Sequence, residues 1–123
     1  MTVEDENCYF LGGICGHAGL FASSTELVRY FDNILNSMWF SDIAKSVDYA
    51  GFDRPEGTDS NYGKKADNSF IGHLGFTGTA VLIDPEKKTV AALLTNSTHP
   101  DPGKPLRKER IKKCRQIFFD EVF

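Results

Sequence analysis

The sequence predicts an α+β protein in which a partial antiparallel sheet is flanked by helices. Two apolar runs of β type, 79–83 and 90–95, are joined by the short turn sequence 84–88 and should form a hairpin. Segments with helical periodicity precede and follow this hairpin. Because the chain has only 123 residues, we expect a single domain over 1–123.

The first helix is predicted over about 24–38. Ser23 is a suitable N-cap, and Glu26, three residues later, completes a capping box. Apolar residues then recur at helical spacing on one face, namely Leu27, Phe31, Ile34, Leu35 and Met38. The glycine-rich segment 8–22 that precedes this helix is expected to be a loop.

The second half of the chain predicts two further elements. A strand is expected over Phe70–Leu74, directly before the hairpin, and a final helix over Leu106–Val122, with Pro105 near its start. One stripe of this helix consists of Ile111, Cys114, Phe118 and Val122. Its first half is basic, with Arg107, Lys108, Arg110, Lys112, Lys113 and Arg115. A solvated face is the simplest interpretation of those charges, and an acidic partner is the alternative.

Residues 39–69 carry the weakest pattern. A short strand that includes Val47 and Tyr49 is predicted there, followed by a polar loop over 53–61. Neither run of the hairpin alternates with polar residues, so we expect both faces of the hairpin to be covered.

The composition argues against several classes of protein. The hydrophobic and charged fractions, 41% and 25%, are those of a globular domain, and the net charge of −3 argues against a nucleic-acid partner. No apolar stretch is long enough to span a bilayer, and the acidic start is not a secretory signal, so we expect no membrane partner and a cytoplasmic chain. The odd set Cys8, Cys15 and Cys114 favours free thiols in a reducing compartment.

Most catalytic motifs are absent from the sequence. No serine is followed by a lysine three residues later, and no tyrosine by an asparagine two residues later. There is also no G-x-S-x-G, Walker or H-E-x-x-H pattern. The three histidines, His17, His73 and His99, are not spaced as metal ligands, so we expect no metal and no cofactor.

One segment, 72–78, does suggest chemistry. Its glycines, Gly72, Gly75 and Gly78, leave a strand edge bare of side chains, and a bare edge lets a substrate backbone or acyl group approach. His73 on that edge could hydrogen-bond a substrate or a neighbouring tyrosine. The alternative interpretation is a tight β-turn with a surface histidine.

This segment and the hairpin resemble a known family. Residues 73–88 and 90–100 look like the C-terminal hairpin of class C β-lactamase-like proteins, a family that includes penicillin-binding DD-peptidases, esterases and D-aminopeptidases. Residues 16–27 are similar to the family's glycine loop and following helix, and 51–57 to a segment of its esterase-like branch. The resemblance extends from about Glu4 to the final helix.

The resemblance implies a fold and a site. The family fold packs a large antiparallel sheet between helices, so this chain would be a C-terminal fragment of the β-lactamase/transpeptidase-like fold, without the part that bears the nucleophile. Of the family motifs S-x-x-K, Y-x-N and K-T-G or H-x-G, only the third maps here, onto His73, Leu74 and Gly75. By resemblance His73 and the backbone N–H of Phe76, an oxyanion donor, are catalytic, and Leu74 and Gly75 bind substrate.

Leu74 departs from the family pattern, in which a threonine or serine hydroxyl often helps to bind a carboxylate. This departure favours an esterase-like ancestor over a β-lactamase or a DD-peptidase. We expect the chain to form one wall of the active-site cleft of a serine hydrolase and to be inactive alone. When an N-terminal half completes the site, the substrate would be a small ester, amide or β-lactam-like molecule. A non-catalytic binding module and a structural remnant are the alternatives, and the incomplete fold could self-associate.

Overall fold

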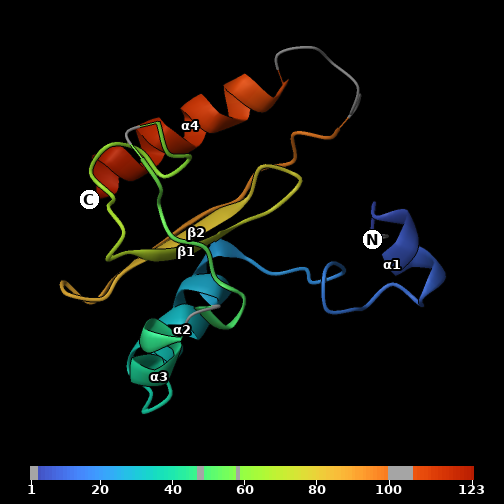
Figure 1. Cartoon of the computed structure of the whole chain (residues 1–123). Helices are drawn as coiled ribbons and strands as arrows, with labels where there is room; N and C mark the ends of the chain where they lie inside the picture. Colours follow the sequence, from blue (N-terminus) through green and yellow to red (C-terminus); the bar gives the residue numbers. More distant parts are fainter. Residues whose placement is uncertain (1–2, 47–48, 58, 100–106) are drawn as a thin grey trace.

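A computed structural model describes residues 3–46, 49–57, 59–99 and 107–123. Figure 1 shows a small sheet in the middle of the molecule, with α4 on one side of it and α2 on the other. In chain order the elements are α1 (Glu6–Phe10), α2 (Ser24–Leu35), α3 (Phe40–Lys45), the 3-10 helix η1 (Tyr49–Gly51), β1 (Ile71–Leu74), β2 (Ala80–Asp84), β3 (Thr89–Leu93) and α4 (Arg107–Val122). The predicted α+β class is confirmed at this level.

The sheet is antiparallel with the order β1-β2-β3. The predicted hairpin is confirmed as β2 and β3, closed by the pair Asp84 and Thr89, and the predicted strand before it is β1. Asp84 accepts hydrogen bonds from the N–H groups of Glu86 and Lys87, at 2.9 and 3.0 Å, which ties the hairpin turn to the strand end. In this order β1 is an edge strand.

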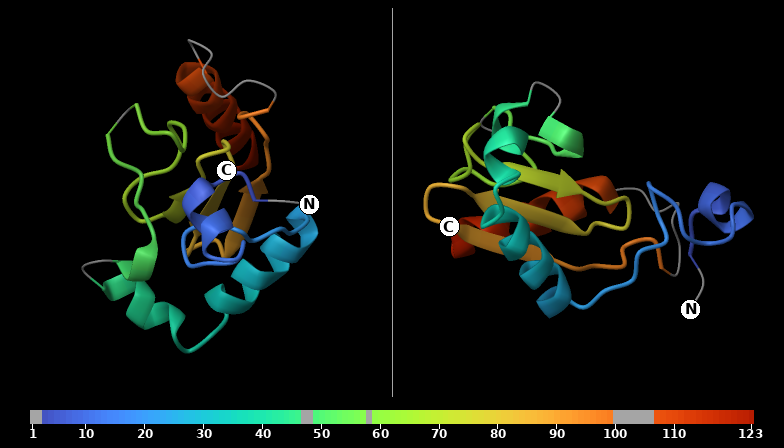
Figure 2. Two further views of the ribbon diagram at one scale, coloured as in Figure 1. Left: turned by 90° about the vertical axis from the view of Figure 1, so that its right-hand side faces the viewer. Right: turned by 90° about the horizontal axis from the view of Figure 1, so that it is seen from below.

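Different helices pack on the two faces of the sheet. Leu82 and Ala80 of β2 face α4, where they form a core with Phe119, and Leu74 of β1 packs against the same cluster. His73 pairs with Val81 and so lies on the opposite face, which α2 crosses (Figure 2). Every residue of β2 is buried, so the expected cover on both faces is confirmed for this strand.

Helix α2 begins as predicted and ends earlier. Ser23 and Glu26 form the capping box, with the Ser23 N–H donating to Glu26 at 2.8 Å. The helix ends at Leu35, because Asn36 and Ser37 turn back on the last carbonyls: the Asn36 amide donates to Asp32 O at 2.9 Å and the Ser37 hydroxyl to Ile34 O at 2.6 Å. The extension to 38 is therefore wrong.

Helix α4 confirms the predicted final helix, but its buried residues do not belong to the stripe of Ile111, Cys114, Phe118 and Val122. Phe119 and Arg115 are its buried residues, whereas Cys114 and Val122 are exposed. Arg115 faces inward because its guanidinium binds backbone carbonyls of the 75–79 turn, so the solvated interpretation of the basic half is wrong at this residue. It holds at the exposed residues Lys108, Arg110 and Lys113. Pro105 and Leu106 lie outside the described residues.

The predicted strand around Tyr49 is also wrong. Tyr49–Gly51 is a 3-10 turn in which Ala50 has φ 48° and Gly51 has φ 86°, and such left-handed conformations end a strand. Val47 lies outside the described residues. The polar loop that follows contacts β1 through one isolated bridge, between Asp53 and Gly72.

A short helix that periodicity did not predict, α1, overlaps the start of the glycine-rich segment, so the expected loop over 8–22 is wrong at residues 8–10. Asp5 caps α1 by accepting a hydrogen bond from the Cys8 N–H at 2.8 Å. After α1 the segment is irregular, apart from a bridge between Cys15 and Ala18. All three cysteines are free, and none of the described helices is long and apolar enough to cross a membrane.

Candidate active-site strand

The segment His73–Phe76 lies at the end of edge strand β1. The N–H and C=O of Gly72 bond to Asp53, at 2.9 and 2.6 Å, and therefore point away from β2. Backbone direction alternates along a strand, so Leu74 presents its N–H and C=O to the same outer edge. Within the part of the chain that the structure describes, no backbone group pairs with Leu74 on that edge.

The chain turns sharply after Leu74. The Gly78 N–H donates to Gly75 O at 3.0 Å, and the Gly75 N–H donates to Thr79 O at 2.8 Å. Gly78 has φ +96°, so the turn continues into β2 through a left-handed glycine of the G1-bulge type. A Cβ at Gly75 would collide with the Thr79 hydroxyl, which fixes glycine at that position too.

Each carbonyl of this turn has a donor. Arg115 of α4 donates from Nη2 to Gly75 O at 2.8 Å and to Thr79 O at 3.0 Å, and from Nε to Gly78 O at 3.0 Å. Arg107 Nη2 donates to Phe76 O at 2.9 Å. Thr77 O accepts from the backbone N–H and hydroxyl of Ser97 and the hydroxyl of Thr95. By contrast, the N–H groups of Phe76 and Thr77 donate to none of the described residues.

The predicted site residues do not all face one way. The His73 side chain is exposed on the α2 side of the sheet, while Leu74 is half-buried toward α4. The ring of Phe76 is 79% exposed and lies under the Arg107 guanidinium, 4.7 Å from ring centroid to Cζ. The structure thus brings an open strand edge and an unpaired N–H together, and separates the His73 and Leu74 side chains.

Leu74 also lines an open hollow of about 810 Å³, which sequence reasoning did not predict. Its other walls are Phe52–Gly57, Asp59–Tyr62 and Asn68. The Tyr62 ring lies against Gly72, where an added Cβ would be 2.8 Å from Cε1, and its hydroxyl donates to Asp53 at 3.4 Å. Burial and the nearby Asp53 carboxylate raise the pKa of Tyr62 well above its usual value, so this phenol stays protonated. Gly72 was the only sequence signal for this contact.

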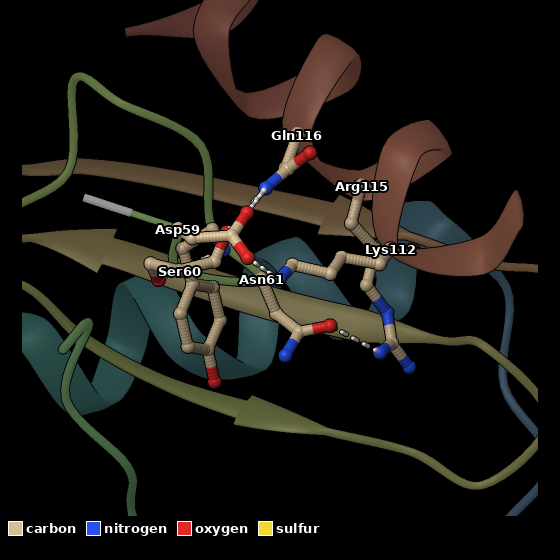
Figure 3. Close-up of polar contacts among 7 residues, drawn as sticks. Asp59, Ser60, Asn61, Lys112, Arg115 and Gln116 are labelled. Carbon is tan, nitrogen blue, oxygen red and sulfur yellow. Dashed lines mark hydrogen bonds and ion pairs between the residues drawn. The ribbon is translucent and has the colours of Figure 1, made fainter. Parts of the chain in front are cut away.

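A cluster of polar side chains joins residues 59–61, which line the hollow, to α4 (Figure 3). Asp59 pairs with Lys112 at 2.5 Å and accepts from Gln116 at 3.3 Å. Gln116 also donates to Ser60 O at 2.8 Å, and Arg115 Nη1 donates to Asn61 at 3.4 Å. Hydrogen bonds from Lys112 and Gln116 lower the pKa of the Asp59 carboxyl. These contacts hold the loop against the helix that supports the turn.

The histidine and cysteine side chains near the N-terminus form a separate cluster. His17 Nε2 lies 3.1 Å from Asp5 and 3.9 Å from the Cys15 sulfur. Burial and the neighbouring Cys15 raise the pKa of the Cys8 thiol to about 11, so Cys8 is a poor nucleophile at neutral pH. Across the described ranges, no group of three or more His, Cys, Asp or Glu side chains is arranged to hold a metal ion.

Comparison with known families decides what this strand belongs to. The family model described as Beta-lactamase matches residues 2–114. The chain belongs to the β-lactamase family. The resemblance read from the hairpin and the glycine loop is therefore confirmed.

The curated proteins that match the chain are much longer than it. An N-acetylmuramyl-L-alanine amidase of Bacillus subtilis (strain 168) is 30% identical over 118 residues, which cover 79% of this chain and 26% of the relative. A putative D-alanyl-D-alanine carboxypeptidase of Escherichia coli (strain K12) is 25% identical over 134 residues, covering 94% and 31%. A protein of the same name from Salmonella paratyphi B is 27% identical, covering 84% and 28%. No solved structure matches the chain.

Proposed function

We propose that this chain is the C-terminal part of a serine hydrolase of the β-lactamase family and supplies one wall of its acyl-transfer cleft. One observation carries the proposal: the open outer edge of β1 at Leu74 lies next to the N–H of Phe76, for which the described chain offers no acceptor. An open edge suits an extended substrate, and an unpaired N–H suits a developing oxyanion.

The chemistry requires residues that this sequence does not contain. Acyl transfer needs an activated serine and its base, and the sequence has neither S-x-x-K nor Y-x-N. Family relatives of which the chain spans 26–31% have ample length for those motifs. The proposed contribution of this chain is the Phe76 N–H, because one oxyanion donor typically stabilises the transition state by about 3 kcal/mol.

The substrate class that we propose is a small ester or amide whose acyl part lies along β1. Leu74 and Gly75 would line the substrate backbone, and His73 would hydrogen-bond the substrate or a tyrosine from the missing half. Leu74 has no hydroxyl, so a carboxylate-binding role at this position is not part of the proposal. The names of the relatives, amidase and carboxypeptidase, belong to amide hydrolases, whereas Leu74 favours the esterase-like branch, so both substrates enter the test.

The test is reconstitution. The chain is co-expressed with an N-terminal segment of a family relative that carries S-x-x-K and Y-x-N, and hydrolysis of p-nitrophenyl esters and a D-alanyl amide is measured. We expect turnover by the complex and none by this chain alone, and a fluorophosphonate probe should label only the added segment. Stoichiometric labelling of a serine in this chain would show that the assignment of the nucleophile is wrong.

Variants then test the site residues. His73→Ala should lower the rate of the complex by about a hundredfold, the usual cost of losing a positioning group. Phe76→Pro should abolish turnover because proline has no N–H, whereas Phe76→Leu keeps the N–H and should retain most of the rate. His99→Ala is the control for loss of an exposed histidine. If the complexes form tightly and His73→Ala and Phe76→Pro both keep full activity, the strand has only a structural role and the site assignment is wrong.

A further inference from the structure

The peptide between Gly75 and Phe76 links α4 to the unpaired N–H. A trans peptide is planar, and its C=O and N–H point in opposite directions. Gly75 O accepts from Arg115 Nη2 at 2.8 Å and from the Gly78 N–H at 3.0 Å. Whatever fixes the direction of Gly75 O therefore also fixes the direction of the Phe76 N–H.

Arg115 is an unusual residue to find behind this turn. It is only 7% exposed, and all its hydrogen bonds in the described chain go to oxygens that carry no full charge: three backbone carbonyls and the side chain of Asn61. None of the ion pairs among the described residues includes Arg115. Burial lowers the pKa of its guanidinium, but an arginine remains charged at neutral pH. Burying a cation without a partner carboxylate carries a desolvation penalty, which other interactions of the charge must offset.

We infer that Arg115 is a positioning residue for acyl transfer: it orients and polarises the Gly75–Phe76 peptide so that the Phe76 N–H serves as the oxyanion donor. The inference rests on the proposed function of Phe76. The guanidinium holds the carbonyl end of the peptide, and the oxyanion would form at the N–H end. A cation bound to the carbonyl strengthens the N–H as a donor, because hydrogen bonds in a chain polarise one another.

The geometry requires an arginine at this position. Its planar fork reaches Gly75 O and Thr79 O with one nitrogen and Gly78 O with another, so it fixes both ends of the turn at once. A lysine would keep the charge but present a single point donor that cannot span the same carbonyls. We therefore expect Arg115→Lys to retain part of the effect and Arg115→Gln to lose it.

The first experiment uses the chain by itself and needs no activity. In the wild-type chain, NMR should detect a scalar coupling through the hydrogen bond between the Arg115 guanidinium and the Gly75 carbonyl carbon. Arg115→Gln should move the Phe76 amide proton upfield, Arg115→Lys should move it less, and amides of β3 should stay in place. Lys113→Gln removes a positive charge from the exposed side of the same helix and is the matched control.

The second experiment uses the reconstituted hydrolase. Rates are expressed per site titrated with the fluorophosphonate, so a variant that is partly unfolded is not counted as slow. Arg115→Gln should lower kcat on the order of 10- to 100-fold and leave KM within about twofold, because the donor acts mainly in the transition state. Arg115→Lys should recover part of that loss, and Lys113→Gln should behave as wild type.

The two experiments separate the inference from the proposed function. Absence of the Arg115–Gly75 coupling in the wild-type chain, or an unchanged Phe76 shift in a folded Arg115 variant, overturns the inference even if the hydrolase works. Normal kcat per titrated site in Arg115→Gln overturns it as well. A wild-type complex without hydrolysis, in a chain that shows the coupling and the shift, contradicts the proposed function instead. If both variants unfold, the wild-type coupling alone decides.

Discussion

At the scale of single residues, the turn that follows β1 depends on two glycines for two different reasons. Gly75 is needed for space, because the Thr79 hydroxyl occupies the position of its missing Cβ. Gly78 is needed for conformation as well, since it has φ +96° and an added Cβ would collide with the Thr95 hydroxyl. Both constraints act on the five-residue stretch that carries the proposed oxyanion donor.

Replacing Gly78 should therefore destabilise the fold. We expect Gly78→Ala to lower the free energy of unfolding by about 2 kcal/mol or more, from the left-handed backbone and the displacement of Thr95. Gly16→Ala is the control, because Gly16 lacks a positive φ and an added Cβ would contact no atom within 4 Å. Urea denaturation of both variants measures the difference. Equal stability of Gly78→Ala and wild type would contradict the described turn.

Asp59 gives a prediction about pH. Its hydrogen bonds to Lys112 and Gln116 lower the pKa of the carboxyl below the ordinary 3.8 in the folded state. The unfolded chain then binds more protons in acid, so the Asp59 contribution is complete above about pH 4 to 5 and is lost as the pH falls through the folded pKa.

Asp59→Asn should consequently lower the Tm at pH 7 and have a smaller effect at pH 3. Because Asp59 is exposed, the difference at pH 7 should be modest and should shrink in 1 M salt. Lys112→Met removes the partner of Asp59, so the stability of this variant should lack the pH dependence that the pair contributes. Thermal melts at both pH values test this, and a larger effect of Asp59→Asn in acid would have the wrong sign.

At the scale of elements, α2 depends on its N-terminal cap. Ser23 and Glu26 bond reciprocally, and the helix that they begin packs against β3. We expect Ser23→Ala to cost about 1 kcal/mol and to speed amide hydrogen exchange in the first turns of α2. Ser24→Ala, at the first helical residue, changes the same side chain without removing the cap. Similar exchange rates in the two variants would argue against the cap.

What the sequence could predict about the elements follows from how local each determinant is. The cap of α2 and the β2–β3 hairpin are encoded within a few residues, at Ser23 with Glu26 and over 79–95, so both were predicted. The buried face of α4 was not, because Arg115 faces inward only to bind carbonyls about 36 to 40 residues away. Tyr62 was missed for the same reason, since its contact with Gly72 is set by tertiary packing.

The same distinction applies to the candidate site. A short pattern, His73 to Phe76, predicted the strand edge, the turn and the family, and the family is confirmed. The opposite directions of His73 and Leu74 follow from the alternation of side chains along any strand. The donors behind the turn come from α4 and 95–97, and no local pattern reports such partners.

At the scale of the whole molecule, large apolar side chains lie at the surface of two regions. In the N-terminal region Phe10, Ile14 and Leu20 are each more than 80% exposed. Beyond α2, Met38 is 85% and Trp39 71% exposed. The α1 region lies away from the sheet in Figure 1, so it packs little against the core. Exposed apolar surface of this extent is unusual for a stable monomer and is typical of surfaces that pack against other protein.

This exposure predicts how the chain behaves in solution. We expect a dimer or a larger assembly at micromolar concentration, or else a monomer that melts at low temperature, because the core between β2 and α4 must offset the entropy of the whole chain. Sedimentation velocity across a concentration series distinguishes the two. Ile14→Glu with Leu20→Glu should shift the distribution toward monomer, whereas Lys113→Glu, a charge change on the exposed side of α4, should not.

Co-expression with the N-terminal segment of a family relative should suppress self-association, since that segment competes for the same apolar surface. A monodisperse, high-melting monomer of the chain alone would show that these side chains need no cover, and would count against the proposal that the chain is one part of a larger hydrolase.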